Sequence, residues 1–330
     1  MKIAIIGAGG FGTALAILYG QRGDDTWLVA RRPEAAAELA KSRVNSVYLP
    51  GLRLPDGVTV SADRAQALAG ADLAIFAVPS QAMADTLALC RPHLSGVLSV
   101  STAKGLALPS LLRMSEVGAL AGVDLVQLSG PSHAEEVGQL KPTAVVVAHP
   151  DPEMAALARD RLACPTFRLY ASSDRRGVEL AGAFKNVLAI AAGILDGLGL
   201  GDNVKAALLT RGLAEIFRLG VAEGAQPMTF AGLAGLGDLL ATATSPHSRN
   251  RALGLAIGHG ESAAAVRART PYVYEGIFAT QAALALAERA AVEMPIAASL
   301  AQILFEGHRP QDEVARLLGR PLTREDNSDA

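Results

Sequence analysis

The sequence predicts an α/β fold in which an N-terminal Rossmann-type doubly wound sheet is followed by an all-helical C-terminal domain. Strand-like and helix-like patterns alternate through residue 172, as expected for parallel strands joined by helices. Beyond residue 172 the strand patterns stop and only helical periodicity remains. A chain of 330 residues is also long for a single hydrophobic core. We therefore expect two domains, residues 1–172 and residues 173–330.

Composition and charge narrow the possible functions. Half of the residues, 50%, are hydrophobic and the formal net charge is −2, so no basic field would attract nucleic acid. Cys90 and Cys164 lie outside any Cys/His cluster, so we expect no metal site. The N-terminus lacks a signal-peptide pattern and charges interrupt every long apolar run, which predicts a cytoplasmic protein without membrane insertion. The apolar content of the helical half is compatible with a homodimer formed through that half.

A glycine-rich turn near the N-terminus has the context of a dinucleotide-binding site. The buried strand expected at Lys2–Ile6 leads into GAGGFG, and helical periodicity follows over Thr13–Tyr19. In this Rossmann-type arrangement Gly7 permits the tight turn, Gly9 lets the backbone approach a pyrophosphate, and Gly12 lets helix and strand pack closely. The N–H groups at the helix start would face the phosphates. A purely structural glycine turn is the alternative.

Two arginines stand where dinucleotide-binding sites distinguish NAD from NADP. The second strand is expected at Thr26–Ala30, and an acidic residue at its end would bind the ribose hydroxyls of NAD. Arg31 and Arg32 occupy that place instead, and guanidinium groups suit a 2′-phosphate. The sequence therefore favours NADPH/NADP, with NAD also possible. The other interpretation is two solvent-exposed arginines that open the next helix, Pro33–Ser42.

Polar residues follow two later strands at the edge where open α/β sheets bind ligands. Lys104 comes after the strand at Val97–Val100, and Gly130 and Ser132 come after the strand at Leu125–Leu128. We expect Lys104 to contact a substrate or cofactor rather than to be a surface residue. The other two could offer a backbone amide and a hydroxyl to an anion.

The other elements of the N-terminal half complete the alternating pattern. Ser80 is placed to cap the helix that ends at Cys90. His133 is a candidate acid or base, although a histidine beside a turn is more often packed or solvated. A further helix is expected at Pro152–Leu162, and the remaining strands are expected at Val58–Ser61, Leu73–Val78, Thr143–Ala148 and Phe167–Tyr170.

The helix expected at Gly177–Leu198 is apolar nearly all round, which is typical of a buried helix. Glu179, Lys185 and Asn186 nevertheless lie inside it. Glu179 and Asn186 alternate with glycines along one stripe, a pattern that suits a narrow groove where something small approaches the backbone. Burial disfavours the charged form of a lysine, so Lys185 is a candidate general acid/base. The alternative is a lysine that extends to solvent at the helix margin.

Polar clusters interrupt the rest of the helical half. Arg211 and Glu215 are four residues apart and are expected to pair along their helix. The run LAGLGDL contains too much glycine for a regular helix, so we expect a bend at Asp238. The run SRNR begins with Ser248 and starts the next helical segment. The serine hydroxyl, the backbone amides at the helix start and the guanidinium groups can together hold a phosphate. Helices are expected at Asn203–Gly220, Ala252–Ile257, Ser262–Val266, Tyr274–Ala291, Ile296–Glu306 and Gln311–Leu318, with a loose polar tail after Pro321.

These motifs resemble those of the bacterial NAD(P)-dependent sn-glycerol-3-phosphate dehydrogenases through about residue 320. The combination of KNVLAIAAG, GLAGLGDL and SRNR is specific, because distant relatives that share only the Rossmann half lack it. Other matching segments are GAGGFGTALA, NSVYLPG, AVPS, STAKGL, LSGPSHAEEV and SPHSRNR. Three positions depart from the family pattern: Phe11, where tryptophan is frequent, His133, where phenylalanine is frequent, and Ala243, where cysteine is frequent.

The resemblance implies reduction of dihydroxyacetone phosphate to sn-glycerol 3-phosphate for phospholipid synthesis, with Lys185 as general acid/base. Besides the glycine turn, it places cofactor contacts at Gly10, Phe11, Arg31, Arg32, Tyr48, Lys104, Ala134, Arg249, Val273 and Glu275. It places substrate contacts at Lys104, Gly130, Ser132, Lys185, Asp238, Ser248, Arg249 and Asn250. Lys104 and Arg249 stand in both sets, as groups between two anionic ligands.

The expected mechanism pairs hydride transfer with proton donation by Lys185 to the developing alkoxide. Lys104 and Asn186 would orient the carbonyl, and Asp238 would hydrogen-bond a substrate hydroxyl or set the charge state of Lys185. Two alternatives remain. One is a hydroxyacid or ketopantoate-type dehydrogenase, for which a substrate phosphate is dispensable. The other is a non-catalytic nucleotide-sensing protein that binds NADPH and a partner.

Overall fold

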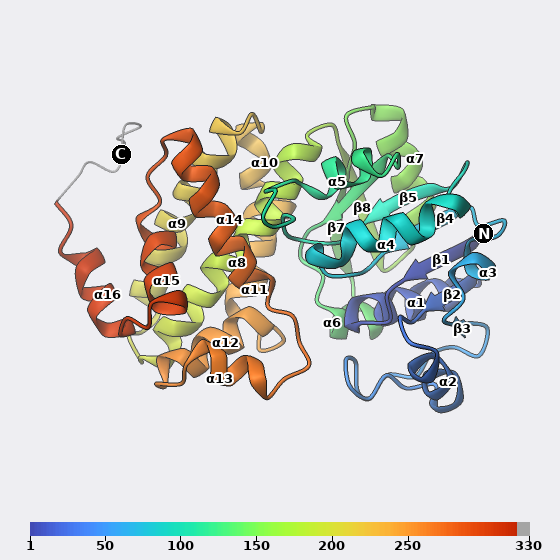
Figure 1. Ribbon diagram of the computed structural model, residues 1–330, viewed down its shortest axis with the longest axis horizontal. Helices are drawn as coiled ribbons and strands as arrows, with labels where there is room; N and C mark the ends of the chain where they lie inside the picture. The colour runs from blue at the N-terminus through green and yellow to red at the C-terminus, as the bar shows by residue number, and fades with distance from the viewer. Residues whose placement is uncertain (322–330) are drawn as a thin grey trace.

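In the computed structural model, which describes residues 1–321, a helix-covered sheet lies beside a bundle of helices (Figure 1). The N-terminus lies in the sheet half, and helix α16 (Pro310–Leu318) lies at the far side of the bundle. The predicted order, an α/β region followed by helices, is confirmed. The polar tail predicted after Pro321 lies outside the described residues.

The sheet has eight strands within residues 1–321, in the order β3-β2-β1-β4-β5-β6-β7-β8. Neighbouring strands are parallel except β6 and β7. That reversal follows from their connection, because its one short helix, α6 (Ala134–Gly138), returns the chain at the same end of the sheet. The order switches direction at β1, so the carboxyl ends of β1 and β4 flank the usual ligand crevice. The strands are β1 (Lys2–Ile6), β2 (Asp25–Val29), β3 (Thr59–Ser61), β4 (Leu73–Phe76), β5 (Leu98–Ser101), β6 (Leu125–Ser129), β7 (Thr143–Ala148) and β8 (Phe167–Ser172).

Alternate residues of the central strands serve two separate hydrophobic cores. Ile3 and Ile5 of β1 pack in one core with Leu15, whereas Ile6 packs in the other with Met83. The strands are therefore buried on both faces, which explains their continuous apolar sequences. The helices that provide the covering side chains are α1 (Gly10–Arg22), α2 (Pro33–Ser42), α3 (Arg64–Leu68), α4 (Met83–Cys90), α5 (Met114–Leu120), α6 and α7 (Pro152–Leu162).

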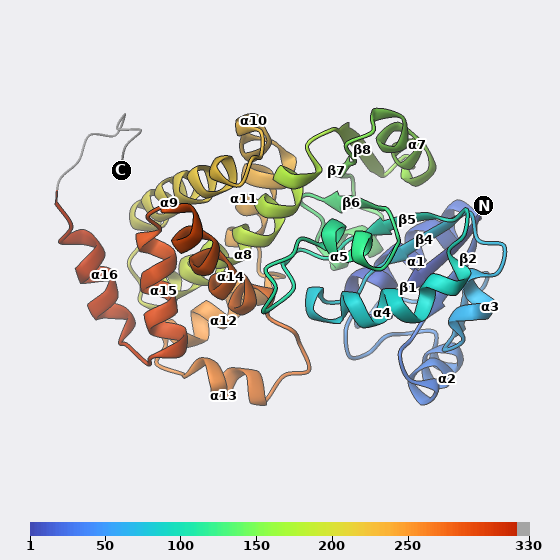
Figure 2. The same ribbon diagram turned by 45° about the horizontal axis from the view of Figure 1, so that its top comes forward.

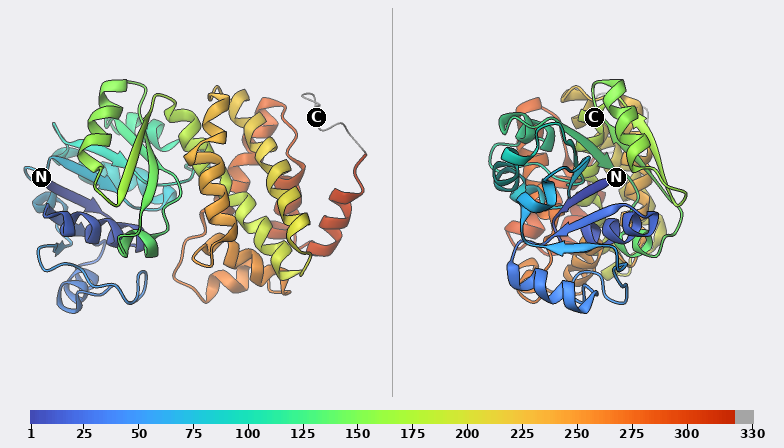
Figure 3. Two further views of the ribbon diagram at one scale, coloured as in Figure 1. Left: turned by 180° about the vertical axis from the view of Figure 1, so that it is seen from behind. Right: turned by 90° about the vertical axis from the view of Figure 1, so that its right-hand side faces the viewer.

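The helical half is built around α8 (Arg175–Gly197), which is buried from residue 177 to residue 195 (Figure 2). Within residues 1–321, α8 is also the one helix that is long and apolar enough to cross a membrane, but the surrounding protein buries that stretch completely. Helices α9, α10 and α11 lie together on one side of the half (Figure 3). The other helices are α9 (Asp202–Ala222), α10 (Pro227–Ala231), α11 (Asp238–Thr244), α12 (Arg249–Gly258), α13 (Ala263–Ala268), α14 (Glu275–Ala290) and α15 (Pro295–Phe305).

Glycines let α8 and α12 approach each other closely. A Cβ atom added at Gly254 would collide with the backbone of Ile190, and one added at Gly193 would collide with the backbone of Arg251. The expectation that this glycine stripe admits something small is therefore wrong at Gly193, because another helix fills the space. The stripe serves helix packing there.

Glu179 links α8 to the sheet half. Its carboxylate accepts hydrogen bonds from the N–H and the hydroxyl of Ser115, both at 2.7 Å, and from the Arg113 guanidinium at 2.8 Å. These donors lie at the start of α5. Glu179, which begins the predicted stripe on α8, is thus a structural anchor rather than part of a ligand groove.

Ser80 does not cap the helix that ends at Cys90, and that prediction is wrong. Ser80 begins a short 3₁₀ turn, and α4 starts only at Met83. The N–H and hydroxyl of Ser80 donate to the two carboxylate oxygens of Glu275 at 2.8 and 2.6 Å. Because Glu275 is the first residue of α14, this pair joins the segment after β4 to the helical half.

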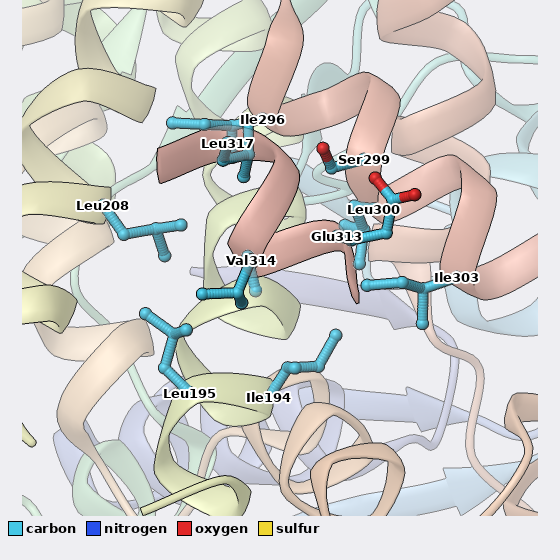
Figure 4. Close-up of a pocket in the computed structure, with 11 residues that line it drawn as sticks. Ile194, Leu195, Leu208, Ile296, Ser299, Leu300, Ile303, Glu313, Val314 and Leu317 are labelled. Carbon is cyan, nitrogen blue, oxygen red and sulfur yellow. The ribbon is translucent and has the colours of Figure 1, made fainter. Parts of the chain in front are cut away.

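Helix α16 covers an apolar pocket at the outer end of the bundle (Figure 4). Its one buried charge, Glu313, pairs with Arg316 at 2.6 Å, and Arg316 also donates to the hydroxyl of Ser299 on α15 at 2.9 Å. The contact therefore combines apolar packing with a small polar network. The apolar lining comes from Ala191, Ile194, Leu195, Leu208, Ile296, Leu300, Ile303, Val314 and Leu317.

Glu215 caps another helix instead of pairing with Arg211. Its carboxylate oxygens accept hydrogen bonds from the N–H groups of Ile296 at 2.9 Å and Ala297 at 3.4 Å, at the start of α15. Arg211 is exposed, whereas Glu215 is buried. The predicted pair is wrong because two unpaired helix-terminal N–H groups approach the buried carboxylate. Burial also raises the pKa of Glu215 to about 7, although these backbone donors oppose the shift.

We expect Glu215→Gln to remove a pH-dependent part of the stability. Because the pKa of Glu215 rises from 4.5 to about 7 on folding, the folded protein holds this proton more tightly than the unfolded chain. The wild type should lose stability relative to the variant as pH rises through this window, by on the order of 3 kcal/mol. Urea unfolding of both proteins at about pH 4.5 and about pH 8 measures this. A difference between them that is independent of pH would contradict the assignment.

Candidate active site

The glycine turn after β1 forms a cradle that fits a dinucleotide. Gly7 has a φ of 117°, in the region that favours glycine, and a Cβ at Gly12 would collide with the backbone of Gly7. A Cβ at Gly9 would meet no atom within 4 Å, so the space beside this residue is open. The N–H groups of the first turn of α1 lack partners inside the helix and lie at its positive end. The turn can therefore receive a pyrophosphate.

Asn45 fixes the neighbouring loop against this turn. Its amide donates to the carbonyl of Ala8 at 3.0 Å and to the hydroxyl of Thr13 at 2.8 Å, and its carbonyl accepts from the N–H of Tyr48 at 3.2 Å. The carbonyl of Tyr48 in turn lies 2.9 Å from where a Cβ at Gly10 would stand. Asn45 is absent from the predicted site. The available signal was its position in a turn-rich loop, where asparagine often bonds to nearby backbone.

Arg31 and Arg32 lie directly beyond β2, as predicted. Both side chains are exposed, and within residues 1–321 neither forms an ion pair. Arg32 also occupies the residue before α2, which begins with Pro33. The two guanidinium groups are thus available to an anion, and their contact with a 2′-phosphate stays a prediction.

Two predicted lysines from different elements meet at the buried carboxylate of Asp238, which is itself a predicted site residue. Asp238 Oδ1 accepts from Lys185 Nζ at 2.5 Å, and Asp238 Oδ2 accepts from Lys104 Nζ at 2.7 Å. Lys185 also donates to the hydroxyl of Thr242 at 2.6 Å. Lys185 comes from α8 and Lys104 follows β5, whereas Asp238 is the first residue of α11. A widened helical turn at residues 233–237 precedes Asp238 and forms the bend predicted from LAGLG.

The charges of this cluster are unbalanced, since two ammonium groups share one carboxylate. Lys185 and Asp238 are 6% and 2% exposed, whereas the Lys104 side chain is 18% exposed. Burial lowers the pKa of Lys185 to about 7; Asp238 opposes this shift and the charge of Lys104 adds to it. Burial alone would raise the pKa of Asp238, but the two lysines outweigh it and hold that pKa below its usual value. Lys185 can therefore release a proton near neutral pH.

The loop after β6 supplies a second partner for Lys104. The carbonyl of Gly130 accepts from Lys104 Nζ at 2.8 Å and from the Ser132 hydroxyl at 2.9 Å. Gly130 has a φ of 130°, and a Cβ there would lie 3.0 Å from the Cα of Val145. The structure thus brings Gly130 and Ser132 to the cluster. Their contact with a substrate stays a prediction.

Two asparagines connect the lysine cluster to the helices behind it. Asn186 donates to the carbonyl of Lys104 at 3.3 Å and accepts from the side-chain amide of Asn250 at 2.9 Å. The side-chain carbonyl of Asn250 accepts from the N–H of Gly276 at 3.2 Å. Both asparagines are buried. This chain of amides fixes the first turn of α12 relative to Lys104.

The run SRNR divides its residues between helix packing and open surface. The Ser248 hydroxyl accepts from the N–H of Arg251 at 3.2 Å and so caps α12. Arg251 pairs with Asp196 at 2.6 Å and joins α12 to α8. Arg249 is exposed, and its guanidinium carbon lies 5.8 Å from the ring centroid of Tyr272. Arg249 is thus the arginine of this run that can meet a phosphate.

The remaining predicted cofactor residues border the glycine turn or the segment before α14. Phe11 packs on the sheet core from the first turn of α1, and Ala134 begins α6. Val273 is partly exposed just before α14. Glu275 is different, because its carboxylate already accepts both hydrogen bonds from Ser80. A direct contact of Glu275 with a cofactor stays a prediction.

His133 packs against the helix that carries Asp238. Its Nε2 lies 3.1 Å from the carbonyl of Ala241, and its ring centroid lies 6.0 Å from that of His247. Burial lowers the pKa of His133, and the nearby lysine charges add to that shift. A neutral ring can donate Nε2–H to the carbonyl, which favours the packed interpretation of this histidine.

Family models match both halves of the chain. A model described as the NAD-dependent glycerol-3-phosphate dehydrogenase N-terminus matches residues 2–155, and the corresponding C-terminus model matches residues 174–315. The chain belongs to the glycerol-3-phosphate dehydrogenase family. The family predicted from the sequence is thereby confirmed.

Relatives within the glycerol-3-phosphate dehydrogenase family are similar along the whole chain. The glycerol-3-phosphate dehydrogenase [NAD(P)+] of Moorella thermoacetica is 48% identical over 326 residues, 98% of this chain and 97% of that protein. The enzyme of the same name from Pelotomaculum thermopropionicum is 47% identical over 330 residues, 98% of this chain and 95% of that protein. A crystal structure of the Coxiella burnetii glycerol-3-phosphate dehydrogenase has a TM-score of 0.91 at 39% identity, covering 96% of this chain and 98% of that one.

The ketopantoate alternative receives support at the level of fold alone. A ketopantoate reductase from Ralstonia eutropha aligns with a TM-score of 0.61 at 17% identity, covering 95% of this chain and 100% of that one. Such a likeness shows a shared architecture and says nothing of a shared substrate. The glycerol-3-phosphate dehydrogenase models, by contrast, match the segments that contain the lysine cluster.

We expect Gly9→Ala and Gly12→Ala to impair the protein for different reasons. Gly9→Ala adds a methyl group to open space, so it should leave the melting temperature within about 2 °C while weakening NADPH binding by at least about tenfold. Gly12→Ala forces a methyl group into the backbone of Gly7 and should lower the melting temperature by about 4 °C or more. Thermal unfolding and fluorescence titration with NADPH measure both effects. Full NADPH affinity in Gly9→Ala would show that the turn is not the phosphate cradle.

Proposed function

We propose that this NAD(P)-dependent oxidoreductase reduces dihydroxyacetone phosphate to sn-glycerol 3-phosphate, in a reversible reaction. The observation that carries the proposal is the buried Lys185–Asp238–Lys104 cluster, which lies between the two halves. Reduction of a phosphorylated ketone requires a cofactor site, a proton donor and a group that holds the phosphate. The glycine turn, Lys185 and the first turn of α12 are the candidates for these three tasks.

The cofactor would be held by the glycine turn and by Arg31 and Arg32. When bound, its nicotinamide supplies the hydride that reduces the ketone carbon. The two exposed guanidinium groups favour the 2′-phosphate of NADPH, and NADH is the other cofactor that we propose. Tyr48, held by Asn45, would contact the cofactor from the neighbouring loop.

Lys185 is the proposed general acid/base. Asp238 and Thr242 hold its ammonium group in place, and burial leaves its pKa at about 7. An ammonium group with such a pKa donates its proton readily to the alkoxide that forms as the ketone is reduced. In the oxidation direction the neutral amine accepts that proton. Lys104 adds positive charge where negative charge develops on the substrate oxygen.

The substrate phosphate would bind at the start of α12. Three features meet there: the exposed guanidinium of Arg249, the positive end of the helix, and the side chains of Ser248 and Asn250. Asn250 is joined through Asn186 to the backbone of Lys104. A phosphate bound at α12 would therefore be fixed relative to the lysine cluster, which positions the reacting carbon.

The decisive experiment compares wild type, Lys185→Ala and Lys141→Ala in NADPH oxidation with dihydroxyacetone phosphate. We expect the wild type and the control at exposed Lys141 to turn over, and Lys185→Ala to lose at least about 1,000-fold in kcat while still binding NADPH. Wild-type reduction should also fall as pH rises through about 7, because it needs protonated Lys185, whereas oxidation should rise through the same range.

Two results of this experiment would contradict the proposal. If the wild type binds NADPH and leaves dihydroxyacetone phosphate untouched, the substrate is wrong. The hydroxyacid alternative would then predict that Arg249→Ala leaves the Michaelis constant of the true substrate nearly unchanged. If Lys185→Ala turns over normally, Lys185 is a structural residue.

The proposed activity leads to proposals on the metabolic role of the enzyme, its cellular location and the roles of its two domains. sn-Glycerol 3-phosphate forms the backbone of glycerophospholipids, so we propose that the enzyme supplies their synthesis. We place it in the cytoplasm. The proposed domain division assigns cofactor binding to residues 1–172 and assigns Lys185 and the phosphate contacts to residues 173–330.

We also propose a homodimer formed through the outer face of α9 and α11 (Figure 3). Phe217 and Leu240 on this face are 38% and 49% exposed, and leucines of both helices line a groove between them. Exposed apolar side chains that gather on one face commonly mark a protein interface. A second copy can cover it because the same patch is presented by both chains.

A charge on this face should separate the proposed dimer. We expect Phe217→Glu to shift the protein from dimer to monomer in size-exclusion chromatography with light scattering. Leu120→Glu is the matched control, because Leu120 is 79% exposed but lies in the sheet half. A wild type that is monomeric at about 100 μM would rule out a stable dimer through this face.

A further inference from the structure

Tyr272 bridges the helical half and the loop beside the glycine turn. It lies between α13 and α14, in the segment that runs toward the sheet half (Figure 2). Its hydroxyl donates to the carbonyl of Val47 at 3.3 Å, and its ring contacts that of Tyr48 edge-on, with centroids 6.2 Å apart. Tyr272 therefore touches the loop that Asn45 fixes against the glycine turn.

Arg249, at the start of α12, lies beside the ring of Tyr272. Its guanidinium carbon lies 5.8 Å from the Tyr272 ring centroid, within the range where a cation is attracted to an aromatic face. Arg249 forms no ion pair within residues 1–321. Its charge does reach the Glu275 carboxylate, where it opposes the rise of that group's pKa on burial. Without a salt bridge to hold it, a long side chain samples many rotamers, so a ring beside it limits the positions of its guanidinium group.

We propose that Tyr272 is a positioning residue, which orients Arg249 for the substrate phosphate and couples that orientation to the cofactor loop through Tyr48. The inference rests on the proposed function, because it takes Arg249 as the phosphate ligand. Tyr272 itself need not touch substrate or cofactor. Its contribution should appear in substrate affinity, since its contacts are with Arg249 and with the loop at Val47 and Tyr48, whereas the Lys185 ammonium group is held by Asp238 and Thr242.

The test is a double-mutant cycle on the full chain, with wild type, Tyr272→Ala, Arg249→Ala and the double variant. We expect Tyr272→Ala to raise the KM for dihydroxyacetone phosphate about three- to tenfold and to change kcat by less than about twofold. In the Arg249→Ala background the same substitution should have no further effect on KM, because its target is gone. Tyr272→Phe keeps the ring and should restore most of the affinity.

A second measurement separates this inference from the proposed function. Calorimetric titration of the NADPH complex with inorganic phosphate needs no turnover, and Tyr272→Ala should weaken phosphate binding by the same factor as it raises KM. A wild type that binds phosphate but does not reduce dihydroxyacetone phosphate would defeat the proposed function alone. The role of Tyr272 is overturned if Tyr272→Ala leaves KM and phosphate affinity unchanged, or if its effect persists in full without Arg249.

Discussion

The carboxylate of Asp238 is the interaction on which the candidate site depends. It is nearly fully buried and joins Lys104, which follows a strand of the sheet, to Lys185 in the central helix of the other half. A buried carboxylate needs compensating charge, so Asp238 keeps both ammonium groups within hydrogen-bond distance. The same arrangement leaves one positive charge in excess. That excess, together with burial, makes the proton of Lys185 easy to release.

The fold supports this cluster by enclosing α8. Helices pack around it closely enough that glycine is required where α12 crosses it, and Glu179 ties its beginning to the sheet half. Further contacts between the halves come from Glu275 with Ser80 and from Tyr272 with the loop beside the glycine turn. The position of Lys185 relative to the glycine turn is therefore set by several independent contacts, each between segments far apart in the chain.

Local patterns predicted most of the elements and part of the site. The glycine turn could be predicted because its motif lies in consecutive residues. The apolar helix around Lys185 predicted burial, with a lysine that extends to solvent as the alternative, and the structure shows it buried. Partners distant in sequence could not be derived in this way. Helical spacing predicts that Glu215 pairs with Arg211, four residues away, whereas its donors lie at Ile296 and Ala297. The antiparallel β6–β7 pair was likewise hidden, because strand sequences do not reveal direction.

The most direct test of this account is the pKa of Lys185 itself. It can be measured from the pH dependence of acetylation at that residue, followed by mass spectrometry, in wild type, Asp238→Asn and Lys104→Met. We predict a wild-type pKa of about 7, a lower value in Asp238→Asn because an attractive anion is lost, and a higher value in Lys104→Met because a repelling cation is lost. A wild-type value near the usual 10.5, or shifts of the opposite sign in the variants, would contradict the account.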